Sequence, residues 1–382
     1  MTSGGVDMRD PADSDDPARL GFDALLDAVR MSGELARDPE RGAHDASGRA
    51  AGYAYATELL RTALDLYVDG NEPRFVPLSS PTPYHAGRRM VYRVQGGLNP
   101  DALYDFAVLR PDRSYRIRGR RGNDCYLSFS FSGGSDGERP DRTVTTLNDR
   151  QMTFEPDGSF EVIISADEHA GNWVRMEPDV CSVIVRQYFL EPLDRRVPAE
   201  LSIQALDGLP DAAPDDPDAV ARRLTAAAAF VRSSNATFPL PLGLADNAFM
   251  DPIGYSGEAG ALGTTDNVYV MGRWHLDPSQ ALIVETTPVP GRYWSLQVWN
   301  HWGQSTTPTI DPAEYPHLIV NSGNATLAPD GSVRITVAAD DPGEPNWLGT
   351  FGWTEGTLIF RYLYPEAEPA VPECRVVDLT TR

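Results

Sequence analysis

One short segment, residues 292–305, carries groups that could bind a small molecule or transfer a proton. Its apolar and polar residues alternate, which predicts a β-strand with two different faces. Apolar walls with a few polar groups are typical of small-molecule sites, and an imidazole changes protonation near neutral pH. We therefore take His301 as the candidate catalytic acid or base, and the candidate ligand-binding residues beside it are Tyr293, Gln297, Trp299 and Trp302. The alternative is that the face of the strand that carries Tyr293, Ser295, Gln297, Trp299 and His301 packs against a helix or against another domain.

A second segment, residues 114–122, places Arg116, Arg118 and Arg120 on one face of a predicted strand. Guanidinium groups spaced by two residues can form a ladder that binds carboxylate, phosphate or sulfate. These three arginines are therefore also candidate ligand-binding residues. The alternative is ion pairing with the Asp and Glu side chains of this acidic chain, whose formal net charge is −22.

The sequence lacks motifs for metals and nucleotide cofactors. Its histidines and cysteines have no zinc-like spacing, and no Gly-x-Gly-x-x-Gly occurs. All 33 basic residues are arginine, so a lysine Schiff base, a P-loop lysine and a kinase-type lysine are excluded. We therefore predict no metal and no cofactor.

The elements that would position these groups occur twice. Residues 154–173 and 327–347 share Pro-Asp-Gly, alternating apolar residues, Ala-Asp and Asn-Trp in the same order. Pro-Asp-Gly is a turn signal, and the alternation after it predicts a strand. We predict a tandem duplication in which residues 100–195 superpose on residues 265–366.

The residues that the two copies share are expected to serve the fold. In the predicted superposition Trp173 lies over Trp347 and Arg186 lies over Arg361. Each tryptophan is expected to fill a sandwich core while the preceding asparagine ties a turn. The two arginines are expected to pair with carboxylates, for which the candidates are Asp167 and Asp340.

The predicted fold class is mainly β with accessory helices (α+β). Each copy contributes many short strands, which favours two tandem β-sandwich or jelly-roll-like domains related by internal duplication. Helices are predicted over residues 17–36, 46–70 and 215–234. The expected domains are a disordered tail over 1–15, helices with the first β repeat over 16–205, and a linker helix with the second repeat over 206–382.

Composition limits the partners. The 382 residues suggest two domains, and the strong negative charge argues against nucleic acid and anionic membranes as partners. The N-terminus has no basic region followed by an apolar stretch, so no secretory signal is predicted. Three scattered cysteines, Cys125, Cys181 and Cys374, predict reduced thiols and a cytoplasmic protein. The oligomeric state stays open.

Three segments together resemble a known bacterial family. They are residues 291–300, the turn and strand over 329–347, and residues 356–366, and they look like the family called domain of unknown function 1214. The Asp-Pro-Gly-x-x-Asn-Trp-Leu pattern over 341–348 is similar to actinobacterial members. The resemblance covers roughly 265–366 and, more faintly, 100–200. It implies a β-sandwich-like fold and no assigned activity.

Two functions are compatible with these features. The first is a cofactor-independent enzyme, a hydrolase, lyase or transferase, acting on a small organic metabolite, either anionic or neutral. Its site would lie in a sandwich pocket or between the repeats. The alternative is a non-catalytic protein that binds a glycan or small metabolite. A carboxylate partner for His301 would favour the enzyme.

Overall fold

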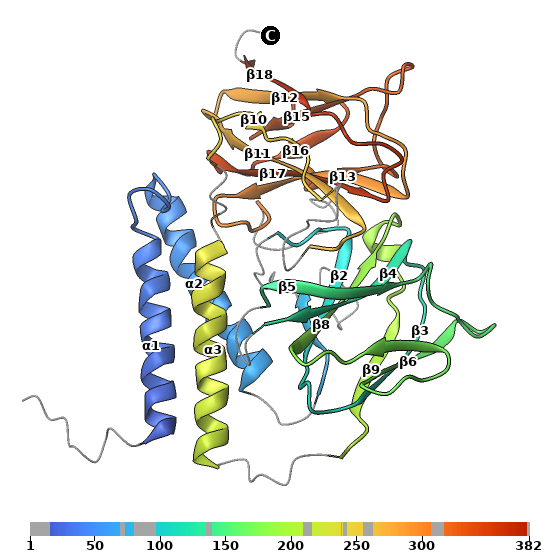
Figure 1. Ribbon diagram of the computed structural model, residues 1–382. Helices are drawn as coiled ribbons and strands as arrows, with labels where there is room; N and C mark the ends of the chain where they lie inside the picture. The colour runs from blue at the N-terminus through green and yellow to red at the C-terminus, as the bar shows by residue number, and fades with distance from the viewer. Residues whose placement is uncertain are drawn as a thin grey trace, which may run out of the picture.

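A computed structural model describes residues 16–68, 73–79, 97–134, 140–208, 216–237, 239, 243–254, 263–306 and 317–379. Two β-sandwiches and a layer of helices make up this part of the chain (Figure 1). The predicted fold class, mainly β with accessory helices, is therefore confirmed. The predicted tail over 1–15 lies outside the described residues.

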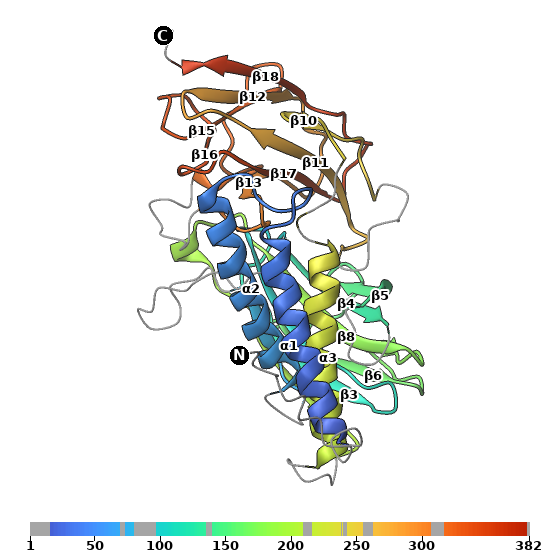
Figure 2. The same ribbon diagram turned by 90° about the vertical axis from the view of Figure 1, so that its left-hand side faces the viewer.

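The helical layer combines segments that are distant in sequence. Its helices are α1 (Pro17–Leu35), α2 (Ala46–Tyr67) and α3 (Pro217–Thr237), and they lie side by side (Figure 2). Carboxylate caps begin the first two, because Asp16 accepts from the amides of Ala18 and Arg19, and Asp45 accepts from the amide of Gly48. No helix in the described part of the chain is both apolar and long enough to cross a bilayer.

The first repeat is a sandwich of two sheets. One sheet has the order β1-β2-β8-β4-β5 and the other has the order β7-β6-β3-β9. The strands are β1 (Val76–Ser79), β2 (Ala102–Val108), β3 (Tyr115–Arg120), β4 (Tyr126–Gly133), β5 (Arg142–Asn148), β6 (Ser159–Ser165), β7 (Asn172–Arg175), β8 (Val180–Tyr188) and β9 (Glu200–Ala205).

The second repeat reproduces this arrangement strand by strand. Its sheets have the orders β10-β11-β17-β13-β14 and β16-β15-β12-β18. The strands are β10 (Ala248–Phe249), β11 (Asn267–His275), β12 (Gln280–Thr286), β13 (Tyr293–Asn300), β14 (Ile319–Asn321), β15 (Val333–Ala338), β16 (Trp347–Gly349), β17 (Glu355–Leu363) and β18 (Glu373–Asp378).

The strand register confirms the duplication. Arg186 of β8 lies between Tyr104 of β2 and Ser128 of β4. Its counterpart Arg361 of β17 lies between Tyr269 of β11 and Ser295 of β13. Both copies therefore place an arginine flanked by a tyrosine and a serine at the centre of the larger sheet.

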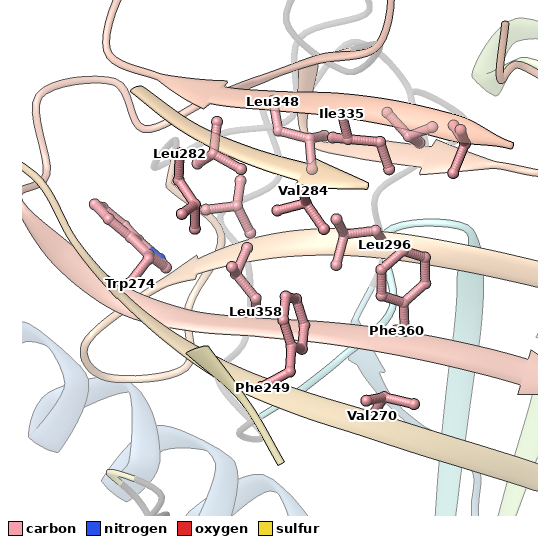
Figure 3. Packing of buried hydrophobic residues seen from close by; sticks show 14 of the residues in the cluster. Phe249, Val270, Trp274, Leu282, Val284, Leu296, Ile335, Leu348, Leu358 and Phe360 are labelled. Atoms are coloured by element: carbon pink, nitrogen blue, oxygen red, sulfur yellow. The ribbon is translucent and has the colours of Figure 1, made fainter. Parts of the chain in front are cut away.

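Apolar side chains that alternate along the strands fill each sandwich. In the second repeat the core includes Leu282 and Val284 of β12, Leu296 of β13, and Leu358 and Phe360 of β17 (Figure 3). Burying each such side chain stabilises the fold by roughly 1.5–3 kcal/mol. On β13 the apolar residues Trp294, Leu296 and Val298 therefore point into the sandwich. The alternate residues Tyr293, Ser295, Gln297 and Trp299, which we call the mixed face, point away from it.

The repeated Asn-Trp pairs are only partly as predicted. Asn172 bonds the backbone of Thr153 and Glu161, and Asn346 bonds the backbone of Thr326 and Arg334, so each asparagine does tie a turn. The prediction of buried tryptophans is wrong, because both rings are partly exposed. They lie on the edge strands β7 and β16, where one side of the strand has no neighbour to cover it.

Candidate functional site

The mixed face of β13 points toward the first repeat. The Tyr293 hydroxyl donates to Asp101 Oδ2 at 2.7 Å and receives a hydrogen bond from Asn99 Nδ2 at 3.0 Å. Gln297 Nε2 donates to the carbonyl of Leu98 at 3.2 Å. These side chains are fully buried. We call this buried region, where the sheets β1-β2-β8-β4-β5 and β10-β11-β17-β13-β14 meet, the junction.

Trp299 and Trp302 lie in two different contacts. The Trp299 ring packs on Gly97, whose φ of +95° and closeness to the indole leave no room for a side chain. Trp302 packs against α2, where its indole N–H donates to the carbonyl of Gly48 at 2.8 Å and its ring stacks on Tyr55. Trp302 therefore connects the second repeat to the helical layer.

His301 follows β13 and meets a carboxylate. Its Nε2 lies 2.8 Å from the carbonyl oxygen of Arg41. A carbonyl only accepts hydrogen bonds, so Nε2 carries the proton of the neutral ring and Nδ1 presents a lone pair. That lone pair faces Glu355, whose Oε1 is 4.0 Å from Nδ1. The two side chains are 15% and 8% exposed, so solvent reaches the pair only at its rim.

Glu355 is held in place by the loop before α2. Its carboxylate accepts from the backbone N–H of His44 at 3.1 Å, and its second oxygen lies 2.8 Å from His44 Nδ1. Residues 1–45 contain no pattern that points to His44, and Glu355 was not among the predicted site residues. One signal existed, because Glu355 stands where the first repeat has Val180, and residues unique to one copy are the better functional candidates.

The surroundings of His301 set its protonation. Burial lowers the pKa of the ring, while the hydrogen bond to the Arg41 carbonyl and the charge of Glu355 oppose that shift. His301 is therefore neutral at neutral pH and able to accept a proton. Nearby, the rings of His44 and His275 stack at 6.5 Å. Within the described residues, no three His, Cys, Asp or Glu side chains converge as metal ligands.

The arginines of β3 lie elsewhere. Arg116 and Arg118 contact the same oxygen of Glu161 at 3.1 and 2.9 Å, and Arg120 contacts Glu200 at 2.7 Å. Their sheet is the one that faces away from the second repeat (Figure 1). The structure thus does not bring these arginines together with His301, and each has a carboxylate of the chain beside it.

The chain is similar to one protein family and to two solved structures. The family model described as "Protein of unknown function (DUF1214)" matches residues 107–191 and 275–367, one match in each repeat. An uncharacterized protein from Burkholderia cenocepacia is 31% identical, with 95% of this chain and 98% of that chain covered and a TM-score of 0.81. A protein from Vibrio parahaemolyticus is 12% identical, with 94% and 100% covered and a TM-score of 0.49. No curated protein matches the chain.

Proposed function

Because this chain belongs to the DUF1214 family, which is described as of unknown function, we propose its activity from its own side chains. We propose that the protein is an enzyme without a nucleotide cofactor, in which His301 is the general base and Glu355 supports it. The observation that carries the proposal is the neutral His301 lone pair facing a carboxylate 4.0 Å away. A positioned base of this kind accepts a proton from a hydroxyl group or from water.

The spacing of the pair supports a bound donor between its members. A separation of 4.0 Å between Nδ1 and Oε1 is too long for a direct hydrogen bond. An oxygen placed about 2.8 Å from both atoms would see them roughly 90° apart, close to the angle between the two donors of water. The reaction we propose begins when this water or hydroxyl gives its proton to Nδ1 and its oxygen bonds to the carbonyl carbon of an ester-like substrate. The Glu355 carboxylate stabilises the imidazolium, which then returns the proton to the departing alcohol oxygen as its bond to the carbonyl carbon breaks.

The test compares His301→Gln with His275→Gln. The glutamine at 301 can still donate to the Arg41 carbonyl but has no basic nitrogen, and His275 is an exposed imidazole paired with Asp246 at 3.3 Å. Turnover of a panel of small esters and hydroxy acids, beginning with p-nitrophenyl acetate, should fall about 10²–10⁴-fold only for His301→Gln. Full turnover by that variant would refute the proposal.

A second readout needs no substrate. Imidazole ¹⁵N NMR of the full chain should show His301 protonated on Nε2, with a pKa below the ordinary value of 6.5. The unfolded chain then binds the proton more readily than the folded chain, so this group lowers stability as the pH falls from 6.5 through the folded pKa. The variant His301→Gln should not show this loss of folding stability as the pH falls below 6.5. A ring protonated on Nδ1 would contradict the assignment.

A further inference from the structure

Arg361 is a buried charge at the centre of the junction. Its side chain is 4% exposed, and on β17 it lies opposite Tyr269 of β11 on one side and Ser295 of β13 on the other. A guanidinium stays charged in proteins, so burial cannot neutralise it as it can neutralise a lysine. Burying a charge is costly unless an opposite charge lies beside it.

Among the described residues, the groups that Arg361 contacts are neutral. Its Nη1 donates to Gln297 Oε1 at 2.5 Å, and its Nη2 donates to the carbonyl of Gly97. Its guanidinium carbon lies 5.2 Å from the centre of the Trp299 ring and 5.9 Å from that of Tyr269. Throughout the described ranges no carboxylate lies within ion-pair distance of Arg361. Two of five N–H groups are accounted for, which leaves donors for another partner.

Two other arginines at the junction each contact a carboxylate. Arg196, 1% exposed, contacts Asp101 at 3.0 Å. Arg292 contacts Asp149 at 2.5 Å, and that carboxylate is almost fully buried. Arg361 therefore differs from Arg196 and Arg292, which each contact a carboxylate. Its counterpart in the first repeat, Arg186, is also buried and donates to the Ser130 hydroxyl at 2.7 Å.

A second polar group beside Arg361, the Ser295 hydroxyl, has no hydrogen bond of normal geometry within the described residues. Ser295 lies directly opposite Arg361 on the neighbouring strand, so the two side chains share one face. The Ser295 hydroxyl faces the phenol of Tyr293, is completely buried, and makes no hydrogen bond of normal geometry to any described residue. A buried hydroxyl next to a guanidinium with no carboxylate beside it in the described part of the chain is suited to an oxyanion.

We propose that Arg361 and Ser295 bind the oxyanion group, carboxylate or phosphate, of a small organic molecule at the junction. The guanidinium supplies the charge, Ser295 adds a donor, and the Trp299 and Tyr269 rings contact the organic part. Glu355 and Arg361 are six residues apart on one strand, roughly 20 Å. The anion site is therefore separate from the proton-transfer site. The proposal of the anion site does not depend on the proposed proton transfer.

The experiment measures anion binding to the full chain by calorimetry and by thermal melting. The probes are acetate, benzoate and inorganic phosphate, which distinguish a carboxylate from a phosphate ligand, and mass spectrometry of the denatured protein detects a small anion that copurifies. The wild type should bind one of them or release a stoichiometric anion. Arg361→Gln should lower the affinity at least about 100-fold, and Ser295→Ala should lower it several-fold without changing the melting temperature of the free protein.

The control is Arg116→Gln, which removes an arginine already close to Glu161 and should leave anion binding unchanged. Without anion, Arg361→Gln should melt at or above the wild type, because a buried charge without a counter-charge has been removed. A large drop in its melting temperature, with Ser295→Ala binding normally, would make Arg361 a structural residue. The site is equally overturned if the wild type binds no probe and releases no anion.

Discussion

Asp101 shows what a buried charge requires in this protein. Its carboxylate accepts from the Tyr293 hydroxyl at 2.7 Å, from Asn321 Nδ2 at 2.7 Å and from Arg196 Nη2 at 3.0 Å. Burial raises the pKa of Asp101, and the charge of Arg196 opposes this shift. The carboxylate and the guanidinium thus depend on each other, since neither has water to replace its partner.

Asp101→Asn should be strongly destabilising, because it leaves Arg196 buried beside a neutral amide. Removing one member of a buried ion pair typically costs about 3–5 kcal/mol. The matched control is Asp266→Asn, since Asp266 holds the equivalent position in the second repeat but is partly exposed. Urea denaturation should show the larger loss for Asp101→Asn. Equal losses at the two positions would mean that Arg196 does not depend on Asp101.

At the level of single residues, the sequence predicted which side chains face inward or outward on β13, but not which residues contact them. Alternation correctly assigned the two faces of β13, and His301 does lie near a carboxylate. The sequence did not predict that this carboxylate is Glu355 or that Arg41 orients the ring, because each contact joins separate elements of the chain, and Arg41 lies 260 residues before His301. Arg361 was expected to pair with Asp340, and the structure pairs it with Gln297 instead.

At the level of elements, α2 shows how closely a helix can approach a tryptophan. A Cβ built on Gly52 would lie 2.5 Å from the Trp302 ring and 2.7 Å from the Ala36 Cβ. The glycine therefore lets α2, Trp302 and the end of α1 meet. The sequence predicted these helices within a few residues of their observed limits, but not this contact, because helical periodicity does not reveal what a helix face meets.

Gly52→Ala should destabilise the protein by about 1–3 kcal/mol, since one added methyl group overpacks this contact. The comparison is Gly33→Ala in the last turn of α1, where the closest atom to a new Cβ is in the Tyr53 ring at 3.9 Å. That change should stabilise by about 0.5–1 kcal/mol, the ordinary preference of a helix for alanine over glycine. Thermal melting of both variants decides the matter, and a stabilising Gly52→Ala would show that α2 can move away from Trp302.

At the level of the whole molecule, the two repeats face each other reciprocally. The Tyr126 hydroxyl of the first repeat donates to Asp266 of the second at 2.6 Å, and Asn148 Nδ2 donates to the same carboxylate at 3.1 Å. The equivalent tyrosine and asparagine of the second repeat, Tyr293 and Asn321, donate to Asp101 of the first. The junction thus resembles the interface of a twofold-symmetric dimer.

The duplication was visible in the sequence because turns and alternation recur in the same order. The reciprocal junction was not visible, because its polar groups are single residues on different strands, and nothing in a periodic pattern tells which outer face of a sandwich is covered. The symmetry is also incomplete, since Arg196 accompanies Asp101 while Asp266 is partly exposed. The two halves of the junction should therefore differ in energy.

Replacing each junction tyrosine by phenylalanine tests this difference. Tyr293→Phe removes a donor from a carboxylate without access to water, and the loss should be about 1.5–3 kcal/mol, as for hydrogen bonds to charged groups. Tyr126→Phe removes the equivalent donor from Asp266, to which water can gain access, so the loss should be about 0.5–1.5 kcal/mol. Both rings pack on Tyr188, and phenylalanine keeps that contact, while the two hydroxyls bond separate carboxylates. The double variant should therefore show the sum of the two losses to within about 0.5 kcal/mol. Urea denaturation of the three variants measures all of these values. A larger loss for Tyr126→Phe would reverse the assigned asymmetry, and strong non-additivity would show that the repeats separate as soon as either hydrogen bond is lost.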